Sequence, residues 1–450
     1  MNSTNDEKVN LTAEYHSYMT DAITHSVMLD RDKCKGCTNC IKHCPTEAIR
    51  VRDGHARIEN KRCIDCGECI RACQYKAKKA IYDRFEDFAD YKYKIALPAP
   101  SLYGQFEEVN DLDAMLSALV ELGFDDVFEV ARAAEMVSEY TRKYLERNDS
   151  LPSPVISSAC PVIVRLISIR YPLLLDNILP VMPPIEVAAR VARKEALEKH
   201  PELSDEDICV LFISPCPAKA SYVKNPLGVK KSAVSGVLSI GEMFFKMRAA
   251  MKTMREEKVQ AQSGIIGISW AGTSGEASAL FNEKYLAADG IENVIKVLDE
   301  IDNGNIRNLD FVELNACNGG CVGGVLNVEN PYIAKARLQT LRRYLPVSLN
   351  RMGDQRLDSY EWDSLPEPEP VSKLSDDRHE AMRMMREIVA ITHTLPGIDC
   401  GSCGAPTCRA LAEDIVKGRA VADDCVFMMR DKLLKQCGLA PKTEEKGETT

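Results

Sequence analysis

The stretch "DICVLFISPCPAKAS" (residues 207–221) joins a strongly apolar run directly to a loop that carries a cysteine. Its first half is rich in Ile, Val, Leu and Phe, which is typical of a strand buried on both faces. Cys209 inside the run is predicted to be a small core side chain. Cys216 follows the run between two prolines, so we expect its thiol at the carboxyl end of the strand. Ligands of open α/β sheets bind at that edge, and the stretch therefore predicts both a fold class and the place of a site.

Working outward, strand-like and helix-like segments alternate. The segments "YKIALPA" (93–99), "VISSA" (155–159), "GIIGIS" (264–269) and "LDFVEL" (309–314) are predicted strands, and 111–123, 185–199 and 240–254 are predicted helices. This alternation predicts a large α/β domain with mostly parallel sheets. Three more cysteines follow predicted strands and lie beside Pro or Gly: Cys160, Cys317 and Cys321. With Cys216 they would supply the four thiolates of an iron–sulfur cluster.

Two further cysteine runs lie near the N-terminus, "CKGCTNCIKHCP" (34–45) and "CIDCGECIRAC" (63–73). Both have the C-x2-C-x2-C-x3-C spacing of a two-cluster ferredoxin, in which the fourth cysteine of each run binds the other cluster. The runs predict one 4Fe-4S cluster on Cys34, Cys37, Cys40 and Cys73, and a second on Cys63, Cys66, Cys69 and Cys44. The segment 48–59 between them alternates around Asp-Gly and predicts a hairpin, hence a small α+β ferredoxin-like domain. Zinc is the alternative metal that such thiolates could bind.

A third cysteine set occupies residues 400–425. Cys400, Cys403 and Cys408 form C-x2-C-x4-C, a helical segment follows at 409–418, and Cys425 completes four thiolates. The set resembles the small single-cluster domain of corrinoid iron–sulfur proteins and of a subunit of membrane electron-transport complexes. It predicts a small α-helical domain with one C-terminal 4Fe-4S cluster, with zinc as the alternative. Cys437 has no partner pattern and is expected to be a plain thiol.

These segments predict an order of domains along the chain. The Pro- and Glu-rich stretch 362–377 is expected to extend and to tether the C-terminal domain near the α/β domain. The predicted parts are an N-terminal extension (1–25), the ferredoxin-like domain (26–85), the α/β domain (92–360), a linker (361–380), the C-terminal cluster domain (381–438) and a tail (439–450).

Composition narrows the class of protein. The 450 residues carry a net charge of −10 and show no basic stripe, which argues against a nucleic-acid partner. We find no secretion signal and no apolar run long enough to insert into a membrane. Most of the 18 cysteines lie in close clusters, which is typical of metal binding in a reducing compartment. We therefore expect a cytoplasmic protein.

Residues 92–345 resemble the catalytic domain of FeFe (iron-only) hydrogenases. The resemblance rests on segments in the family's order: "LPAPSLYGQF" (97–106), "VELGFDDVFEVARAAEM" (120–136), "SSACP" (157–161), "SPCPAKA" (214–220), "GISWAGTSGEASAL" (267–280) and "ELNACNGGCVGG" (313–324). It implies that Cys160, Cys216, Cys317 and Cys321 hold the H-cluster, a 4Fe-4S part plus a di-iron subsite with CO, CN and a dithiolate, with Cys321 as the bridge. It also implies that Lys219 donates to one cyanide, unless this lysine is merely solvated, and that Pro100 and the Ser101 amide lie beside the other cyanide.

Several positions depart from the family pattern. Where the family has a proton-relay cysteine before the first ligand, this chain has Ala159. Where the family has two methionines near the ligands, it has Ser214 and Asn315. A glutamate is replaced by Tyr222, and an acidic pair by Tyr140 and Thr141, with Glu139 adjacent. The family's triple glycine after Cys321 is shortened to Gly323 and Gly324. These departures resemble the sensory branch of the family and imply intact cluster binding with slow turnover, because proton relays contribute about 10²–10⁴-fold to rate.

The leading hypothesis is therefore a hydrogenase that interconverts dihydrogen with protons and electrons slowly and acts as a hydrogen or redox sensor. Expected partners are maturation proteins, a redox protein such as ferredoxin, and a signalling kinase or phosphatase. The alternatives are a hydrogenase-like cluster-assembly protein without a di-iron subsite, and a multi-cluster electron carrier with an inactive central domain.

Overall fold

The computed structural model describes residues 25–107, 112–148, 151–254, 256–350, 360–369 and 374–439. The chain forms two units, one of residues 1–28, 64–67 and 79–369 and one of residues 29–63, 68–78 and 370–450. The predicted extension before residue 25, the tail after residue 439 and residues 370–373 of the predicted linker lie outside the described residues. Among the described helices, none is both long and apolar enough to cross a membrane.

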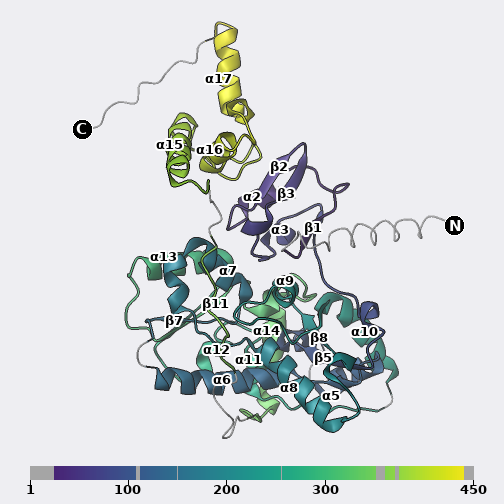
Figure 1. The fold of residues 1–450 in the computed structure, drawn as a ribbon. Helices are drawn as coiled ribbons and strands as arrows, with labels where there is room; N and C mark the ends of the chain where they lie inside the picture. The colour runs from purple at the N-terminus through teal and green to yellow at the C-terminus, as the bar shows by residue number, and fades with distance from the viewer. Residues whose placement is uncertain are drawn as a thin grey trace, which may run out of the picture. The chain divides into compact units, whose positions relative to one another are not determined.

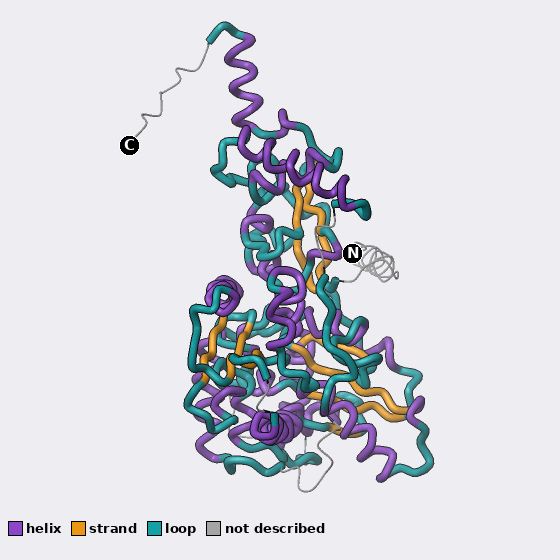
Figure 2. The backbone as a smooth tube through the Cα atoms, turned by 60° about the vertical axis from the view of Figure 1, so that its left-hand side comes forward, coloured by secondary structure: helices purple, strands orange, loops and turns teal. Residues whose placement is uncertain are grey.

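The first unit contains two sheets in which every pair of strands is parallel (Figures 1 and 2). The larger sheet has the order β6-β5-β8-β9, formed by β5 (Tyr93–Pro98), β6 (Asp126–Val127), β8 (Ile208–Ser214) and β9 (Gly236–Ser239). The smaller sheet has the order β10-β11-β7, formed by β7 (Val155–Ile156), β10 (Tyr285–Asp289) and β11 (Phe311–Asn315). The prediction of an α/β domain with mostly parallel sheets is confirmed.

Helices connect and cover these strands, as parallel pairing requires. Around the larger sheet lie α5 (Leu112–Glu121), α8 (Pro184–Lys199) and α10 (Ile240–Thr253), which match the three predicted helices. Beside the smaller sheet lies α13 (Ile291–Asp302), which packs on β10 and β11. All seven residues of β8 are buried, and Cys209 is a core side chain as predicted. β8 is thus one of the two inner strands of the larger sheet.

One predicted strand is wrong. Residues 264–269 form the helix α11 (Ile265–Ser269), because a short apolar run does not distinguish a strand from a buried helix. The first amides of α11 are satisfied without a sheet partner: Gly264 donates to Glu135, and Ile265 donates to the Pro346 carbonyl at 2.8 Å. Gly267 lets α11 approach α6 (Val130–Arg147) closely, since a Cβ there would lie 2.1 Å from the Ala131 oxygen.

The second unit contains the predicted hairpin, formed by β2 (Ile49–Arg52) and β3 (His55–Ile58) in antiparallel pairing. Asp53 and Gly54 at its tip have φ of 54° and 75°, the left-handed pair that a type I′ turn requires. Each cysteine run enters a short helix, α2 (Asn39–Lys42) or α3 (Glu68–Arg71). The strands β1 (Val27–Leu29) and β4 (Lys78–Ala80) form a further two-stranded sheet.

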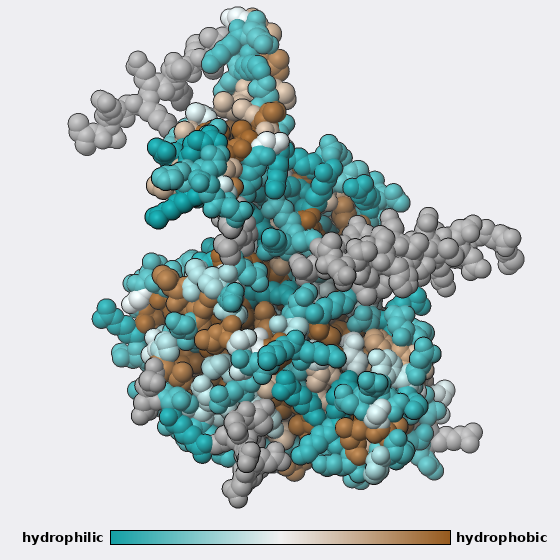
Figure 3. Space-filling view, in the orientation of Figure 1, coloured by the Kyte–Doolittle hydropathy of each residue, from teal (hydrophilic) through white to brown (hydrophobic). Residues whose placement is uncertain are grey.

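The C-terminal part of the second unit is helical, as predicted. Its elements are α15 (Arg378–Thr394), α16 (Cys408–Val416) and α17 (Val426–Gln436), with a small core that includes Ile388, Leu395 and Leu411. Apolar spots along α17 in Figure 3 agree with its exposed Val426 and Leu433. This domain forms one unit with the ferredoxin-like hairpin, with which it shares ion pairs that include the buried pair of Arg50 and Asp414. The expectation that the linker tethers it near the α/β domain stays a prediction.

We predict that Gly267→Ala destabilises the protein by about 1–3 kcal/mol, because the added methyl group meets the α6 backbone. The matched control is Gly272→Ala, whose added Cβ would find its nearest neighbour 3.7 Å away, at the Gly319 oxygen. Thermal unfolding measures both variants. Equal melting temperatures for the two variants would contradict the close α6–α11 contact.

Candidate active site and cluster-binding cysteines

Four cysteines of the first unit follow the carboxyl ends of parallel strands. Cys160 follows β7 and begins α7 (Pro161–Arg170), Cys216 follows β8, and Cys317 and Cys321 follow β11. Burial raises the pKa of Cys321 to about 12, and the nearby thiols of Cys216 and Cys160 add to this rise. Three of the four predicted ligands therefore lie close together. Cys317 precedes Cys321 in a turn closed by the Gly320 amide, which donates to the Cys317 carbonyl at 3.0 Å.

The loop that carries Cys317 and Cys321 packs tightly against the end of β8. A Cβ on Gly324 would lie 2.2 Å from the Pro215 oxygen, and the Leu326 amide donates to that same oxygen at 2.9 Å. Because only glycine permits this approach, the loop holds Cys321 beside Cys216.

The replaced methionine positions stabilise this framework. The Ser214 hydroxyl donates to the Cys216 carbonyl at 2.9 Å and accepts from the Cys216 amide at 3.2 Å. The Asn315 side-chain amide donates to Glu313 at 2.7 Å, and the backbone carbonyl of Asn315 accepts from the Gly290 amide at 3.0 Å. Both side chains hold backbone or carboxyl groups of the site through hydrogen bonds, which a methionine side chain would not donate.

Lys219 lies on α9 (Ala218–Lys224), one turn after Cys216. Its Nζ donates to the Ala159 carbonyl at 3.0 Å and lies 5.4 Å from the centroid of the Tyr222 ring. The ring is buried, and burial raises the pKa of the Tyr222 hydroxyl. The ammonium is therefore half-buried between a carbonyl and an aromatic face, unlike a merely solvated lysine.

Pro100 and Ser101 begin the short helix α4 (Pro100–Tyr103), directly after β5. Both residues are buried, and the Ser101 carbonyl accepts from the Gln105 side chain at 2.9 Å. The Ser101 hydroxyl is buried and finds no hydrogen-bond partner among the residues that the structure describes. An unpaired buried hydroxyl is costly, so this oxygen fits a site that is completed by a polar ligand.

Two buried carboxyl groups, Glu276 and Glu313, were missed by the sequence reasoning. Glu276 lies on α12 (Gly275–Ser278) and accepts from the Ser157 hydroxyl at 2.6 Å. Glu313 lies on β11 and accepts from the amides of Ser274 and Ala277 at 2.9 and 2.8 Å. Both glutamates stand in segments that carry the family resemblance, so their acidic character inside apolar motifs was the available signal.

The Glu313 carboxylate acts on the pKa of Glu276 and on the pKa of the Cys321 thiol. Burial raises the pKa of Glu276, and the Glu313 carboxylate raises it further, although the Ser157 hydrogen bond and the Lys219 charge act against the rise. Burial also raises the pKa of Glu313. Ser157 is linked to the position before Cys160, because its Oγ accepts from the Ala159 amide at 3.2 Å. The pair is thus able to hold a proton near the thiols.

The other residues of the expected proton path are engaged elsewhere. The Tyr140 hydroxyl donates to Glu361 at 3.0 Å, and Glu139 forms an ion pair with Lys143 at 2.7 Å along α6. The Thr141 hydroxyl is buried and has no hydrogen-bond partner in the described part of the chain. That Glu139 replaces the missing acidic groups stays a prediction, whereas the Glu313 carboxylate lies near enough to Cys321 to raise the pKa of its thiol.

The first ferredoxin-type cysteine set comes together as predicted from spacing. Burial raises the pKa of Cys40 to about 11, and the neighbouring thiols that add to the rise are those of Cys34, Cys37 and Cys73. The same four cysteines line one cavity. The Ala48 amide donates to Cys44 Sγ and the Ala77 amide to Cys73 Sγ, each at 3.2 Å, so the two runs repeat the same N–H···S contact. Such amides fit thiolates that hold 4Fe-4S clusters.

The C-terminal set also converges. One cavity is lined by all four of its cysteines, Cys400, Cys403, Cys408 and Cys425. The hydroxyl of Thr407 caps α16 by accepting from the Ala410 amide at 3.1 Å, and this helix start positions Cys408. The exposed Cys437 follows α17 and does not line this cavity.

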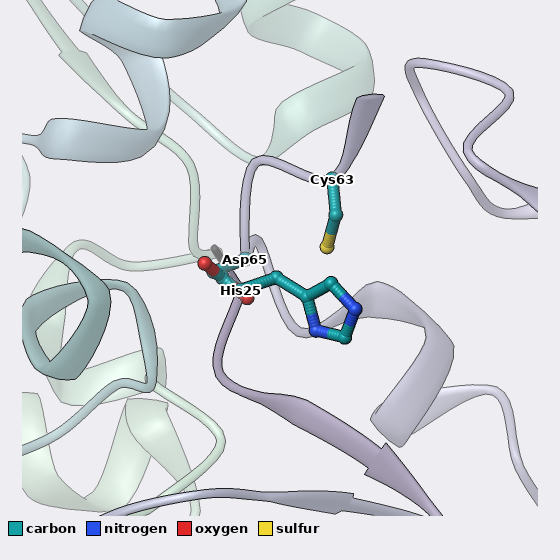
Figure 4. A group of neighbouring side chains, drawn as sticks. All are labelled: His25, Cys63 and Asp65. Atoms are coloured by element: carbon teal, nitrogen blue, oxygen red, sulfur yellow. The ribbon is translucent and has the colours of Figure 1, made fainter. Parts of the chain in front are cut away.

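Figure 4 shows Asp65 beside the imidazole of His25. The Asp65 carboxylate accepts from the Ser26 amide at 2.8 Å, the Ser221 hydroxyl at 2.5 Å and Arg165 at 3.2 Å. Burial raises the pKa of Asp65 in spite of the Arg165 charge. With both oxygens engaged, Asp65 ties α7 and α9 to residue 26, and we interpret it as a structural anchor.

Comparison with known families assigns the large domain. The family described as "Iron only hydrogenase large subunit, C-terminal domain" matches residues 92–282 and 249–325, more than half of the chain. The chain belongs to the iron-only hydrogenase family. A 4Fe-4S dicluster domain matches residues 26–74, and an Fe-S cluster domain matches residues 395–427. Along the sequence, the iron-only hydrogenase match therefore lies between a 4Fe-4S dicluster match and an Fe-S cluster match.

Two relatives of this chain are distant in sequence. Iron hydrogenase 1 from Clostridium pasteurianum is 23% identical over 374 residues, which cover 68% of this chain and 65% of the relative. The NADP-reducing hydrogenase subunit HndD from Solidesulfovibrio fructosivorans is 23% identical over 349 residues, 67% of this chain and 57% of the relative. The chain thus spans less than two thirds of either relative. A solved structure of the apo FeFe-hydrogenase HydA1 from Chlamydomonas reinhardtii is 17% identical, with a TM-score of 0.48 over 67% of this chain and 95% of its own.

The raised pKa of Glu276 predicts a pH effect on stability. The folded state binds this proton more tightly than the unfolded state, so the free energy of unfolding falls as pH rises from the ordinary carboxyl range toward the raised pKa. We expect Glu276→Gln to flatten this fall, measured by denaturant unfolding over a pH series. The control is Glu283→Gln, an exposed carboxylate on the same unit. Identical pH slopes in wild type and Glu276→Gln would contradict the assignment.

Proposed function

We propose that this member of the family binds dihydrogen and interconverts it slowly with protons and electrons, and that it works as a hydrogen or redox sensor. The observation that carries the proposal is Ala159. In the position before the first cysteine ligand, this residue offers only its backbone: its carbonyl accepts from Lys219 and its amide donates to Ser157. Neither group exchanges a proton with a substrate at physiological pH.

Cys160, Cys216, Cys317 and Cys321 would hold the H-cluster, with Cys321 as the bridge to its di-iron subsite. When bound, the cluster supplies the redox chemistry that splits dihydrogen into two protons and two electrons. Lys219 would neutralise an anionic ligand in the half-buried pocket, because an ammonium makes strong charge-assisted hydrogen bonds there. The hydroxyl of Ser101, which has no partner among the described residues, and the start of α4 support a second polar ligand contact on the β5 side. Pro100 would shape that contact.

Protons would leave through side chains of this chain that the sequence did not single out. The Ser157 hydroxyl donates to Glu276 at 2.6 Å, and Glu276 is coupled to Glu313. A carboxyl with a raised pKa is suited to accept and return a proton near neutral pH. The Ser274 amide donates to Glu313. The Ser274 hydroxyl lies 3.2 Å from the hydroxyl of the half-buried Tyr285, which would continue the route toward the surface.

Slow turnover follows from this arrangement. The route begins at Ser157, whose hydroxyl is separated from the cluster ligand by two residues, and it lacks the thiol that would begin at position 159. A missing relay typically costs about 10²–10⁴-fold in rate. A protein that binds dihydrogen but converts it slowly is suited to report the gas, with its 4Fe-4S clusters passing electrons to a redox partner such as ferredoxin or to a signalling kinase or phosphatase. Maturation proteins would install the di-iron subsite.

Infrared spectroscopy of the maturated full chain tests the function. We expect carbonyl and cyanide stretching bands that change when dihydrogen is admitted. Bands that are absent after maturation would overturn the proposal and favour the alternative of a hydrogenase-like cluster-assembly protein or electron carrier without a di-iron subsite.

A variant series tests the proton route. Ala159→Cys is expected to raise the rate of dihydrogen evolution, because it returns a titratable group beside Cys160. Glu276→Gln is expected to lower that rate by about 10²–10⁴-fold, because it removes the first carboxyl of the route. The control Glu139→Gln removes a carboxylate that is paired with Lys143 and should leave the rate unchanged. A wild-type rate in Glu276→Gln would remove Glu276 from the route.

A further inference from the structure

The C-terminal cluster domain is docked onto the ferredoxin-like hairpin by acidic side chains of α16. Asp414 is buried and accepts from Arg50 Nε and from Arg52 Nη2, each at 2.8 Å. Beside it, Glu413 accepts from Arg62 at 2.7 Å. The side chains of Arg50 and Asp414 are only 7% and 4% exposed, so this pair lies in the interior of the contact.

The same contact reaches the loop that carries the C-terminal cysteines. The Val51 amide on β2 donates to the Gly404 carbonyl at 2.8 Å, and Arg52 donates to the Cys403 carbonyl at 2.8 Å. Gly404 has φ of 79°, and a Cβ there would lie 2.0 Å from the Val51 oxygen. The cysteine loop therefore pairs with a strand edge that would otherwise present unpaired backbone groups.

A second approach brings two cysteine loops together. A Cβ on Gly401 would lie 3.3 Å from Ile41 Cδ1 and 3.5 Å from Lys42 Cε. Gly401 directly follows Cys400, and Ile41 directly follows Cys40. The ligand segments of two predicted clusters thus approach each other closely, one residue away from a cysteine on each side.

We propose that the C-terminal cluster exchanges single electrons directly with the cluster held by Cys34, Cys37, Cys40 and Cys73, and that the salt bridges of Asp414 and Glu413 hold the two ligand loops in contact. In each transfer one 4Fe-4S cluster loses one electron and the other gains it, with no bond made or broken. The contact of Ile41 with Gly401 provides a short path, and electron transfer falls steeply with distance. The inference goes beyond the proposed function, since it needs the clusters but no dihydrogen turnover.

The complementary charges explain why this docking is specific. The hairpin and the segment after it supply Arg50, Arg52 and Arg62, whereas α16 supplies Glu413 and Asp414. Charge-assisted pairs of arginine and carboxylate fix orientation as well as affinity. A further pair at the rim, Arg419 with Glu59 at 3.2 Å, has the opposite polarity, which favours a single way of docking.

Electron paramagnetic resonance of the fully reduced, reconstituted full chain tests the proposal. Reduced 4Fe-4S clusters in close contact broaden one another's signals. In wild type we expect broadening beyond that which the two ferredoxin-type clusters cause in each other, and we expect this additional broadening to be lost in the double variant Cys400→Ala and Cys403→Ala, which lacks the C-terminal cluster. Asp414→Asn is expected to keep the iron content and to lose the same broadening, because the loop is released from Arg50 and Arg52.

Two further variants make the outcome decisive. Arg52→Gln acts from the hairpin side and should reproduce the effect of Asp414→Asn even if the latter fails to fold. Glu387→Gln removes an exposed carboxylate of α15 that pairs with Arg383, and should leave the signal as in wild type. Signals in wild type that equal the sum of independent clusters would overturn the proposal, as would unchanged broadening in both Asp414→Asn and Arg52→Gln.

Discussion

The structure depends on the close contact between the end of β8 and the glycine-rich loop after β11. The Pro215 carbonyl meets Gly324 and accepts from Leu326, while Ser214 bridges the amide and the carbonyl of Cys216. These backbone contacts, rather than side-chain packing, bring thiols from the larger and the smaller sheet to one place. A single tight loop is thus enough to join the carboxyl ends of β8 and β11, which belong to different sheets, into one site.

The second constraint is the balance of charge in this buried place. Desolvation raises the pKa of the Cys321 thiol and of the Glu276 carboxyl, and Lys219 is the nearby cation that opposes both rises. The ammonium is itself held by the Ala159 carbonyl and the Tyr222 ring, so the replacements at positions 159 and 222 still serve to place it. The departures from the family pattern leave Cys160, Cys216 and Cys321 close together, and under the proposed function Glu276 and Glu313 carry the protons instead.

Charge governs the second unit in a different way. Removing one partner of a buried ion pair such as Arg50 and Asp414 typically costs about 3–5 kcal/mol, because the remaining charge stays desolvated. The pair thus fixes one position of α16 against the hairpin. A flexible linker alone would leave the C-terminal domain free to adopt many positions relative to the hairpin, whereas the ion pair selects one.

The sequence alone determined the fold class, the cysteine sets and the hairpin, because cysteine spacing, strand-to-loop transitions and an Asp-Gly turn are local features. It did not determine that residues 264–269 are helical, because that depends on Gly267 packing on α6. Nor did it identify Glu276 and Glu313, since a glutamate becomes a proton-holding group only when distant segments bury it. The docking of Asp414 between Arg50 and Arg52 joins residues more than 360 positions apart, and only the tertiary structure decided it, because desolvation and charge pairing act between groups that folding brings together.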